Sequence, residues 1–81
     1  MELNKFVSLF AAQFEETAAS NFNSDTVFRN LEEWSSLTSL SVIAMVDEEY
    51  NIKLTGDDIR SSKTILDIFK IIEAKIIDFK L

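Results

Sequence analysis

The chain contains a single glycine and no proline in 81 residues, and this scarcity limits its fold more than any other feature. Strands joined by tight turns usually need more of both residues, because glycine and proline supply the backbone conformations that turns require. The length allows one domain, which we expect to span residues 1–81. We therefore predict a single all-α domain.

The spacing of apolar residues predicts three longer helices and one short helix. The first is expected over residues 3–18, and the second from Ser35 or Ser36 to about residue 51. A short third helix is expected over residues 57–61, after the capping residue Thr55, and the last begins near Thr64. Its apolar stripe is Ile65, Ile68, Phe69, Ile72, Ile76 and Phe79. The neighbouring pairs 71–72 and 76–77 fit closure of the core better than a partner surface.

Residues 20–36 are the least regular part of the sequence, because side chains that bond to their own backbone crowd its first half. Five large apolar residues nevertheless recur there: Phe22, Val27, Phe28, Leu31 and Trp34. We expect this long first loop to lie over the core. The predicted architecture is a small four-helix bundle with three longer helices, a short third helix and a long first loop.

The composition removes many kinds of chemistry from consideration. Without Cys or His there is no disulfide, no Cys/His zinc site and no common nucleophile–base pair. Catalysis would depend on carboxylates, Lys or Tyr, and adjacent acids such as Glu48 and Glu49 point about 100° apart on a helix, so they form no dyad. We expect a protein that is not an enzyme and that exposes its acid pairs, Glu32–Glu33 included, to solvent.

The charge and the apolar runs indicate the kind of partner. With 14 acids and 8 bases the net charge is −6, which favours basic partners over nucleic acid. No apolar run is long enough to span a membrane, and residues 1–5 lack the features of a signal peptide, so we expect a cytoplasmic protein. Residues 47–58 do not form a calcium loop, because Ile52 and Asp58 stand where that loop needs Gly and Glu.

The start of the second helix is the strongest candidate for a modification site. Ser36 is expected to be the first helical residue, so its hydroxyl would be exposed and rigidly held beside the free N–H groups of the first turn. A phosphate on that oxygen would be stabilised there. Physical arguments by themselves favour the simpler interpretation, in which Ser35 and Ser36 only cap the helix.

Residues 28–72 resemble the acyl carrier protein family, whose members carry a phosphopantetheine group. That family has Asp-Ser-Leu at the start of its second helix, and this chain has Ser36-Leu37 there. The spacing from Ser36 to Glu49-Tyr50 is similar to the family's spacing from its modified serine to Glu-Phe. Residues 57–59 resemble the family's short third helix, and residues 64–68 resemble the start of its fourth.

The resemblance implies that a separate phosphopantetheinyl transferase attaches 4′-phosphopantetheine to Ser36. The terminal thiol of that arm would hold an acyl or aminoacyl group as a thioester, and partner enzymes with basic patches would attach and transfer it. Leu37 and Met45 are the expected apolar partner contacts, with a place in the core as the alternative. The expected acidic contacts are Asp47, Glu48, Glu49, Asp57 and Asp58.

The chain also departs from the family's pattern near the serine. Ser35 stands where the family usually has Asp, Glu33-Trp34 where it often has Gly, and Thr38 and Ser41 where acids are common. These departures suggest a stand-alone, monomeric carrier in a specialised pathway rather than in standard fatty-acid synthesis. They also motivate an alternative, a binding module that has the carrier fold, is never loaded and acts through its acidic face.

Overall fold

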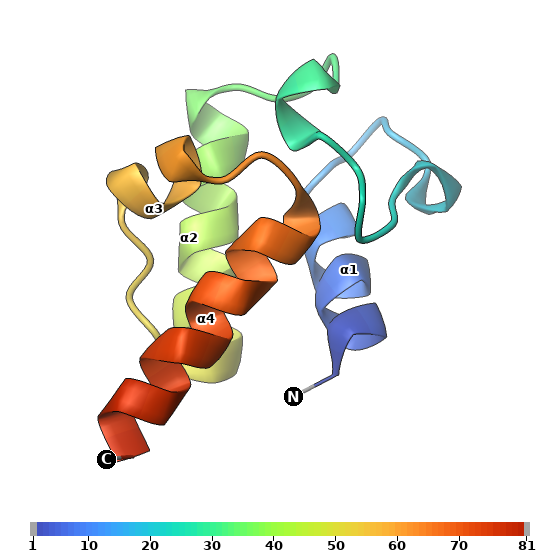
Figure 1. The fold of residues 1–81 in the computed structure, drawn as a ribbon. Helices are drawn as coiled ribbons and strands as arrows, with labels where there is room; N and C mark the ends of the chain where they lie inside the picture. Colours follow the sequence, from blue (N-terminus) through green and yellow to red (C-terminus); the bar gives the residue numbers. More distant parts are fainter. Residues whose placement is uncertain (1, 81) are drawn as a thin grey trace.

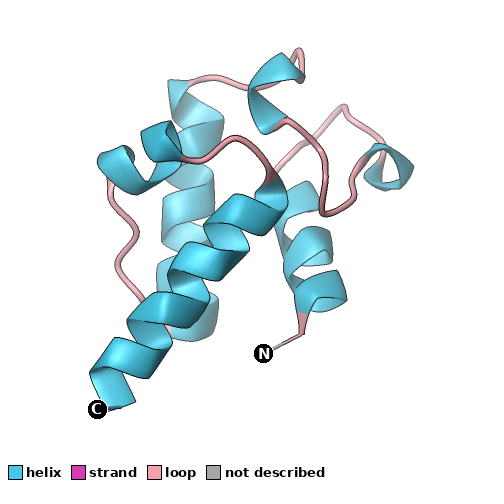
Figure 2. Cartoon of the chain, viewed as in Figure 1, coloured by secondary structure: helices cyan, strands magenta, loops and turns pink. Residues whose placement is uncertain are grey.

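The computed structural model describes the backbone of residues 2–80 and the side chains of residues 2–77. Its helices are α1 (Leu3–Ala11), α2 (Ser36–Tyr50), α3 (Gly56–Ser61) and α4 (Ile65–Lys80), with 3-10 turns η1 (Ala19–Asn21) and η2 (Phe28–Asn30). No strand forms among the described residues, and the one isolated bridge joins Val27 to Thr64. The all-α prediction is confirmed (Figures 1 and 2).

Helices α1 and α4 each pack against two other helices. Helix α1 contacts both α2 and α4, and α3 contacts α4. Figure 1 shows that α2 and α4 run in the direction opposite to α1, so the long first loop returns from the end of α1 to the start of α2. This arrangement brings the start of α2, the first loop and α3 to the same end of the molecule.

Helix α1 is shorter than the sequence predicts, because it ends at Ala11 rather than near residue 18. The Gln13 and Phe14 N–H groups donate hydrogen bonds to the carbonyl oxygens three residues back, with N–O distances of 3.1 and 3.0 Å. The chain after the helix is therefore wound more tightly than an α-helix. Farther on, the Glu15 and Glu16 N–H groups donate to a carboxylate in the loop, that of Glu33. A distant side chain thus replaces the carbonyl partners that a continuing helix would have offered.

The other helix boundaries agree with the sequence prediction, because local capping determines them. Ser35 and Thr38 form a capping box at the start of α2, and Thr55 and Asp58 form one at the start of α3. Helix α2 ends at Asn51, which adopts a left-handed conformation with φ of 55°. In the segment after it, burial alternates, with Ile52 and Leu54 buried on either side of exposed residue 53.

The core combines aliphatic side chains with a group of aromatic ones. All the phenylalanines whose side chains are described are buried: Phe6, Phe10, Phe14, Phe22, Phe28 and Phe69. The first loop lies over this core as predicted, with Leu31 and Trp34 packed against it. Its path is also tied to the start of α4, since Ile65 and Leu66 donate backbone hydrogen bonds to the carbonyls of residues 26 and 24, at 3.2 and 2.9 Å.

Helix α4 closes the core with most of its predicted stripe. Ile72 is buried, and Ile71 and Ile76 pack against the core at partial burial. Ile77 is 57% exposed, so its expected role in core closure is wrong. The side chain of Phe79 lies outside the described residues. Among residues 2–80, no helix combines the length and the apolar character that crossing a bilayer requires.

Candidate functional site

Ser36 is the first residue of α2, and its side chain is exposed. The residues on both sides of it form the cap. The Thr38 N–H donates to Ser35 Oγ at 3.4 Å, and the Ser35 N–H donates to Thr38 Oγ1 at 2.7 Å. The capping interpretation is therefore correct for Ser35, while none of the hydrogen bonds among the described residues uses the Ser36 hydroxyl.

Trp34 fixes the chain immediately before this cap. Its ring is nearly parallel to that of Phe10, with centroids 6.3 Å apart and planes 6° apart, and it packs at 4.7 Å against Phe28. Aromatic contacts of this kind add to the free energy that burial already provides. The backbone that presents Ser36 is consequently anchored to the core within two residues of the exposed hydroxyl.

Glu33 adds a second anchor on the polar side of the same segment. Its carboxylate accepts the backbone N–H groups of Glu15 and Glu16, at 3.1 and 2.9 Å, and the hydroxyl of Thr17 at 2.5 Å. The hydrogen bond from Thr17, followed by those from the backbone, lowers the pKa of Glu33 below its ordinary value. The prediction that Glu33 is simply a solvated acid is therefore wrong, and nothing in the local sequence indicated this long-range partner.

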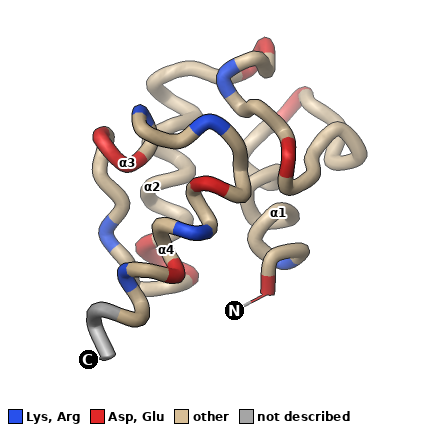
Figure 3. Tube along the Cα trace, viewed as in Figure 1, with Lys and Arg blue, Asp and Glu red and all other residues tan. Residues whose placement is uncertain are grey.

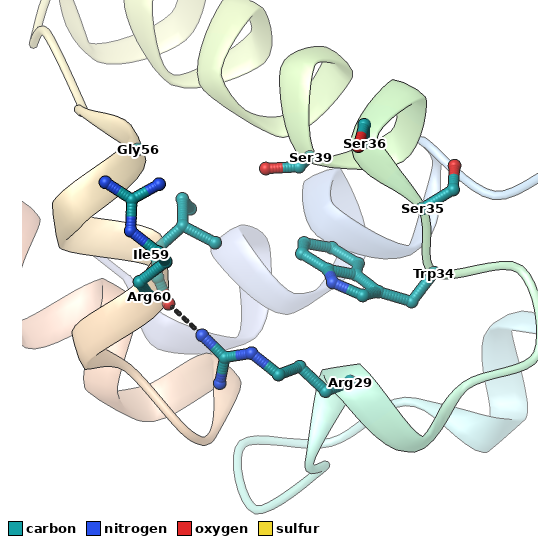
Figure 4. Close-up of a pocket in the computed structure, with 8 residues that line it drawn as sticks. All are labelled: Arg29, Trp34, Ser35, Ser36, Ser39, Gly56, Ile59 and Arg60. Atoms are coloured by element: carbon teal, nitrogen blue, oxygen red, sulfur yellow. Dashed lines mark hydrogen bonds between the residues drawn. The ribbon is translucent and has the colours of Figure 1, made fainter.

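A pocket of about 250 Å³ opens beside Ser36, between the start of α2, the turn η2 and α3. Figure 4 shows the guanidinium groups of Arg29 and Arg60 at separate points near α3, the ring of Trp34 across from them, and the Ser39 hydroxyl directed into the space between. The sequence analysis missed this site, because Arg29 and Arg60 lie in different elements that only the folded chain brings together.

Two leucines form an exposed apolar pair next to Ser36. Leu37 is 75% exposed and Leu40 is 61% exposed, and their spacing of three residues places them on one face of α2. Leu40 was missed as a surface residue, although apolar residues around the whole circumference of α2 were a signal that some of them face solvent. Met45 is only 5% exposed and packs in the core, so its role as a partner contact is wrong and the alternative, a place in the core, is confirmed.

The predicted acidic contacts, whose positions along the backbone are among those coloured red in Figure 3, differ in whether a base of the same chain pairs with them. Glu48 and Glu49 are exposed, and no ion pair among the described residues involves them. The other three acids pair with bases of the same chain, Asp47 with Lys53 at 2.6 Å, Asp58 with Lys75 at 2.7 Å, and Asp57 with Arg60. The acidic face is therefore narrower than the sequence suggests.

Asp58 in particular serves the fold. Its carboxylate accepts the Thr55 N–H at 2.9 Å as part of the α3 cap, and the Lys75 ammonium holds it from α4. Partial burial alone would raise the pKa of Asp58, but the hydrogen bonds from Lys75 and Thr55 outweigh it and lower that pKa. With its side chain only 22% exposed and its Oδ2 atom bonded to both Thr55 and Lys75, Asp58 is a poor partner contact, contrary to the prediction.

Comparisons with known proteins add nothing to the geometry around Ser36. No protein-family model, curated protein or solved structure matches the chain.

Proposed function

We propose that this protein is a carrier similar to the acyl carrier protein family, with 4′-phosphopantetheine attached to Ser36. A transferase would direct the Ser36 oxygen at the β-phosphorus of coenzyme A. A new P–O bond forms, the pyrophosphate bond breaks, adenosine 3′,5′-bisphosphate leaves, and the hydroxyl proton passes to a base of the transferase. The arm supplies a thiol on which an acyl or aminoacyl group is held as a thioester.

The single observation that supports this proposal most is the presentation of Ser36. Its side chain is exposed, and it sits on the first turn of a helix whose preceding segment is held by Trp34 on one side and Glu33 on the other. A transferase needs a hydroxyl that is accessible and fixed in position, because misplacement of reacting atoms lowers the rate steeply. The order of the helices, with a short third helix before the last, is also compatible with the carrier fold that the resemblance implies.

The composition supports the same proposal. A chain with no Cys and no His has neither a reactive sulfur nor a common general base of its own. In a carrier the thiol belongs to the attached arm, and partner enzymes provide the catalytic groups. The carboxylates with shifted pKa values, Glu33, Asp58 and Asp67, are all shifted downward, which keeps them ionised.

Partner enzymes would dock on the exposed face of α2. Leu37 and Leu40 provide an apolar contact beside the modified serine, and Glu48 and Glu49 provide negative charge near the other end of the helix. Charge complementarity speeds encounter without requiring high affinity, which suits a carrier that visits several enzymes in turn.

The mass of the protein isolated from the cells that make it tests this proposal. A carrier is recovered with an increase corresponding to one phosphopantetheine group, and fragmentation places that increase on residues 36–37. Recovery of purely unmodified chain together with a stably bound partner would instead support the alternative, an unloaded binding module. In that case, substitution of Glu48 and Glu49 by Gln is expected to weaken binding of that partner.

A further inference from the structure

The pocket beside Ser36 has a charge opposite to that of the protein as a whole. The chain has a net charge of −6, yet two of its 8 basic residues line this one pocket and none of its acids does. The lining residues are Arg29, Trp34, Ser35, Ser36, Ser39 and Arg60, with Gly56 and Ile59 completing the wall. A local concentration of cationic donors in an acidic protein indicates a binding site for an anion.

Arg29 is held rigidly and without a carboxylate partner. Its Nη1 and Nη2 atoms donate to the carbonyl oxygens of Ser62 and Ile59, at 2.5 and 2.6 Å, and no ion pair among the described residues involves it. These two bonds tie the end of α3 to the first loop. They leave three of the five guanidinium N–H donors for another acceptor, and a side chain already fixed loses little entropy on binding.

Arg60 and Ser39 add donors from two other elements. Arg60 pairs with Asp57, but both side chains are mostly exposed, 73% and 87%, so an ion pair of this kind competes weakly with an incoming anion. The Ser39 hydroxyl faces the same opening from α2 (Figure 4). The Ser36 and Leu37 N–H groups occupy the first two helical positions, where the helix itself offers no acceptor.

We propose that this pocket binds phosphate esters, and that its ligand in the functional protein is the phosphodiester formed on Ser36. The inference rests on the proposed function for the identity of that ligand. Guanidinium groups match the oxygens of a phosphate in geometry and charge, and the pocket adjoins the residue on which the ester would form. Binding there holds the base of the arm against α2 and α3, so that the arm leaves the protein in a defined direction.

The unmodified chain allows a direct test with inorganic phosphate and with free 4′-phosphopantetheine. Trp34 is the one tryptophan of the sequence and lines the pocket, so its fluorescence reports occupancy. At constant ionic strength we expect a saturable change with both compounds and none with pantetheine, which lacks the phosphate. Arg60→Gln raises the Kd about fivefold. Lys5→Gln, which removes a base from the exposed surface of α1, leaves the Kd unchanged.

A second pair of variants tests whether phosphate binding can be made tighter rather than weaker. Asp57→Asn removes the carboxylate that pairs with Arg60 and is expected to tighten phosphate binding about threefold. Glu73→Gln, which removes one negative charge from an exposed position on α4, is expected to leave phosphate binding unchanged. Absence of a saturable response, or equal effects of pocket and control variants, overturns the phosphate site. These titrations do not require loading, so failure of the transferase reaction with phosphate binding intact removes the carrier proposal and retains the anion site.

Discussion

The Thr17 hydroxyl donates to the Glu33 carboxylate at 2.5 Å, although the two residues lie 16 positions apart in the sequence. The same carboxylate accepts hydrogen bonds from the N–H groups of Glu15 and Glu16. One side chain therefore links the turn after α1 to the segment that precedes α2. Thr38 continues this connection, since its hydroxyl donates to the Glu33 carbonyl at 2.9 Å. The environment of Ser36 is therefore coupled to a turn far from it in the sequence.

Glu33→Gln is expected to lower the urea midpoint of unfolding, because a neutral amide cannot accept three hydrogen bonds as a carboxylate does. Glu32→Gln is the matched control, since it removes the same charge from an exposed neighbour. Urea titrations followed by circular dichroism give both midpoints. Equal midpoints for the two variants would show that Glu33 does not hold the loop.

Stability is expected to fall in acid, over a range set by three carboxylates. The pKa values of Glu33, Asp58 and Asp67 lie below their ordinary values of 4.5, 3.8 and 3.8, so each group is more readily protonated in the unfolded chain. Their contribution is complete above those ordinary values and is lost as the pH falls through the lowered ones. Urea midpoints measured from about pH 7 to about pH 3 test this, and Glu33→Gln should flatten the decline. A midpoint that rises below the ordinary values would contradict the assignment.

Trp34→Ala is expected to cost about 2–4 kcal/mol of unfolding free energy, because it empties the site between Phe10 and Phe28. Trp34→Phe keeps part of the contact and should cost about 1 kcal/mol. Leu37→Ala, which removes an exposed side chain from the same segment, should change stability by less than about 0.5 kcal/mol. If Trp34→Ala were as mild as Leu37→Ala, the indole would not be the anchor of the Ser36 segment.

Leu40→Ser is expected to leave stability within about 0.5 kcal/mol of the parent, because Leu40 is 61% exposed. It should lower kcat/KM for transfer of the phosphopantetheine arm about fivefold, since an apolar contact beside the reacting serine is lost. Ile77→Ser makes the same kind of change at an exposed position of α4 and serves as the control. An equal loss in both variants would argue against docking on α2.

The parts of this structure that the sequence predicts are those with local causes. The capping residues Ser35, Thr55 and Thr64 indicate where helices begin, and helical spacing identifies most of the buried face of α4. The end of α1 was not predictable in this way, because the Glu15 and Glu16 N–H groups, which a continuing helix would use, donate instead to Glu33, 17 positions beyond Glu16. Likewise, the sequence left open whether Met45 lies at the surface or in the core and did not single out Leu40, because apolar residues occur around the whole of α2. Packing in the folded chain buries Met45 and leaves Leu40 exposed.

The pocket beside Ser36 is a further case of tertiary origin. Arg29 follows Phe28 in η2, and Arg60 follows Ile59 in α3, so no spacing along the chain associates the two guanidinium groups. The acidic face is smaller than predicted for the same reason, because Lys75 reaches Asp58 only when α4 packs beside α3.

Intact mass after incubation with coenzyme A and a promiscuous phosphopantetheinyl transferase tests the central claim most directly. We predict that the parent protein gains the mass of one phosphopantetheine group, that Ser36→Ala gains none, and that Ser8→Ala, which lacks an exposed hydroxyl of α1 outside the pocket, is modified like the parent. A parent protein that stays unmodified under conditions that load a control carrier, or a gain that persists in Ser36→Ala, would contradict the account.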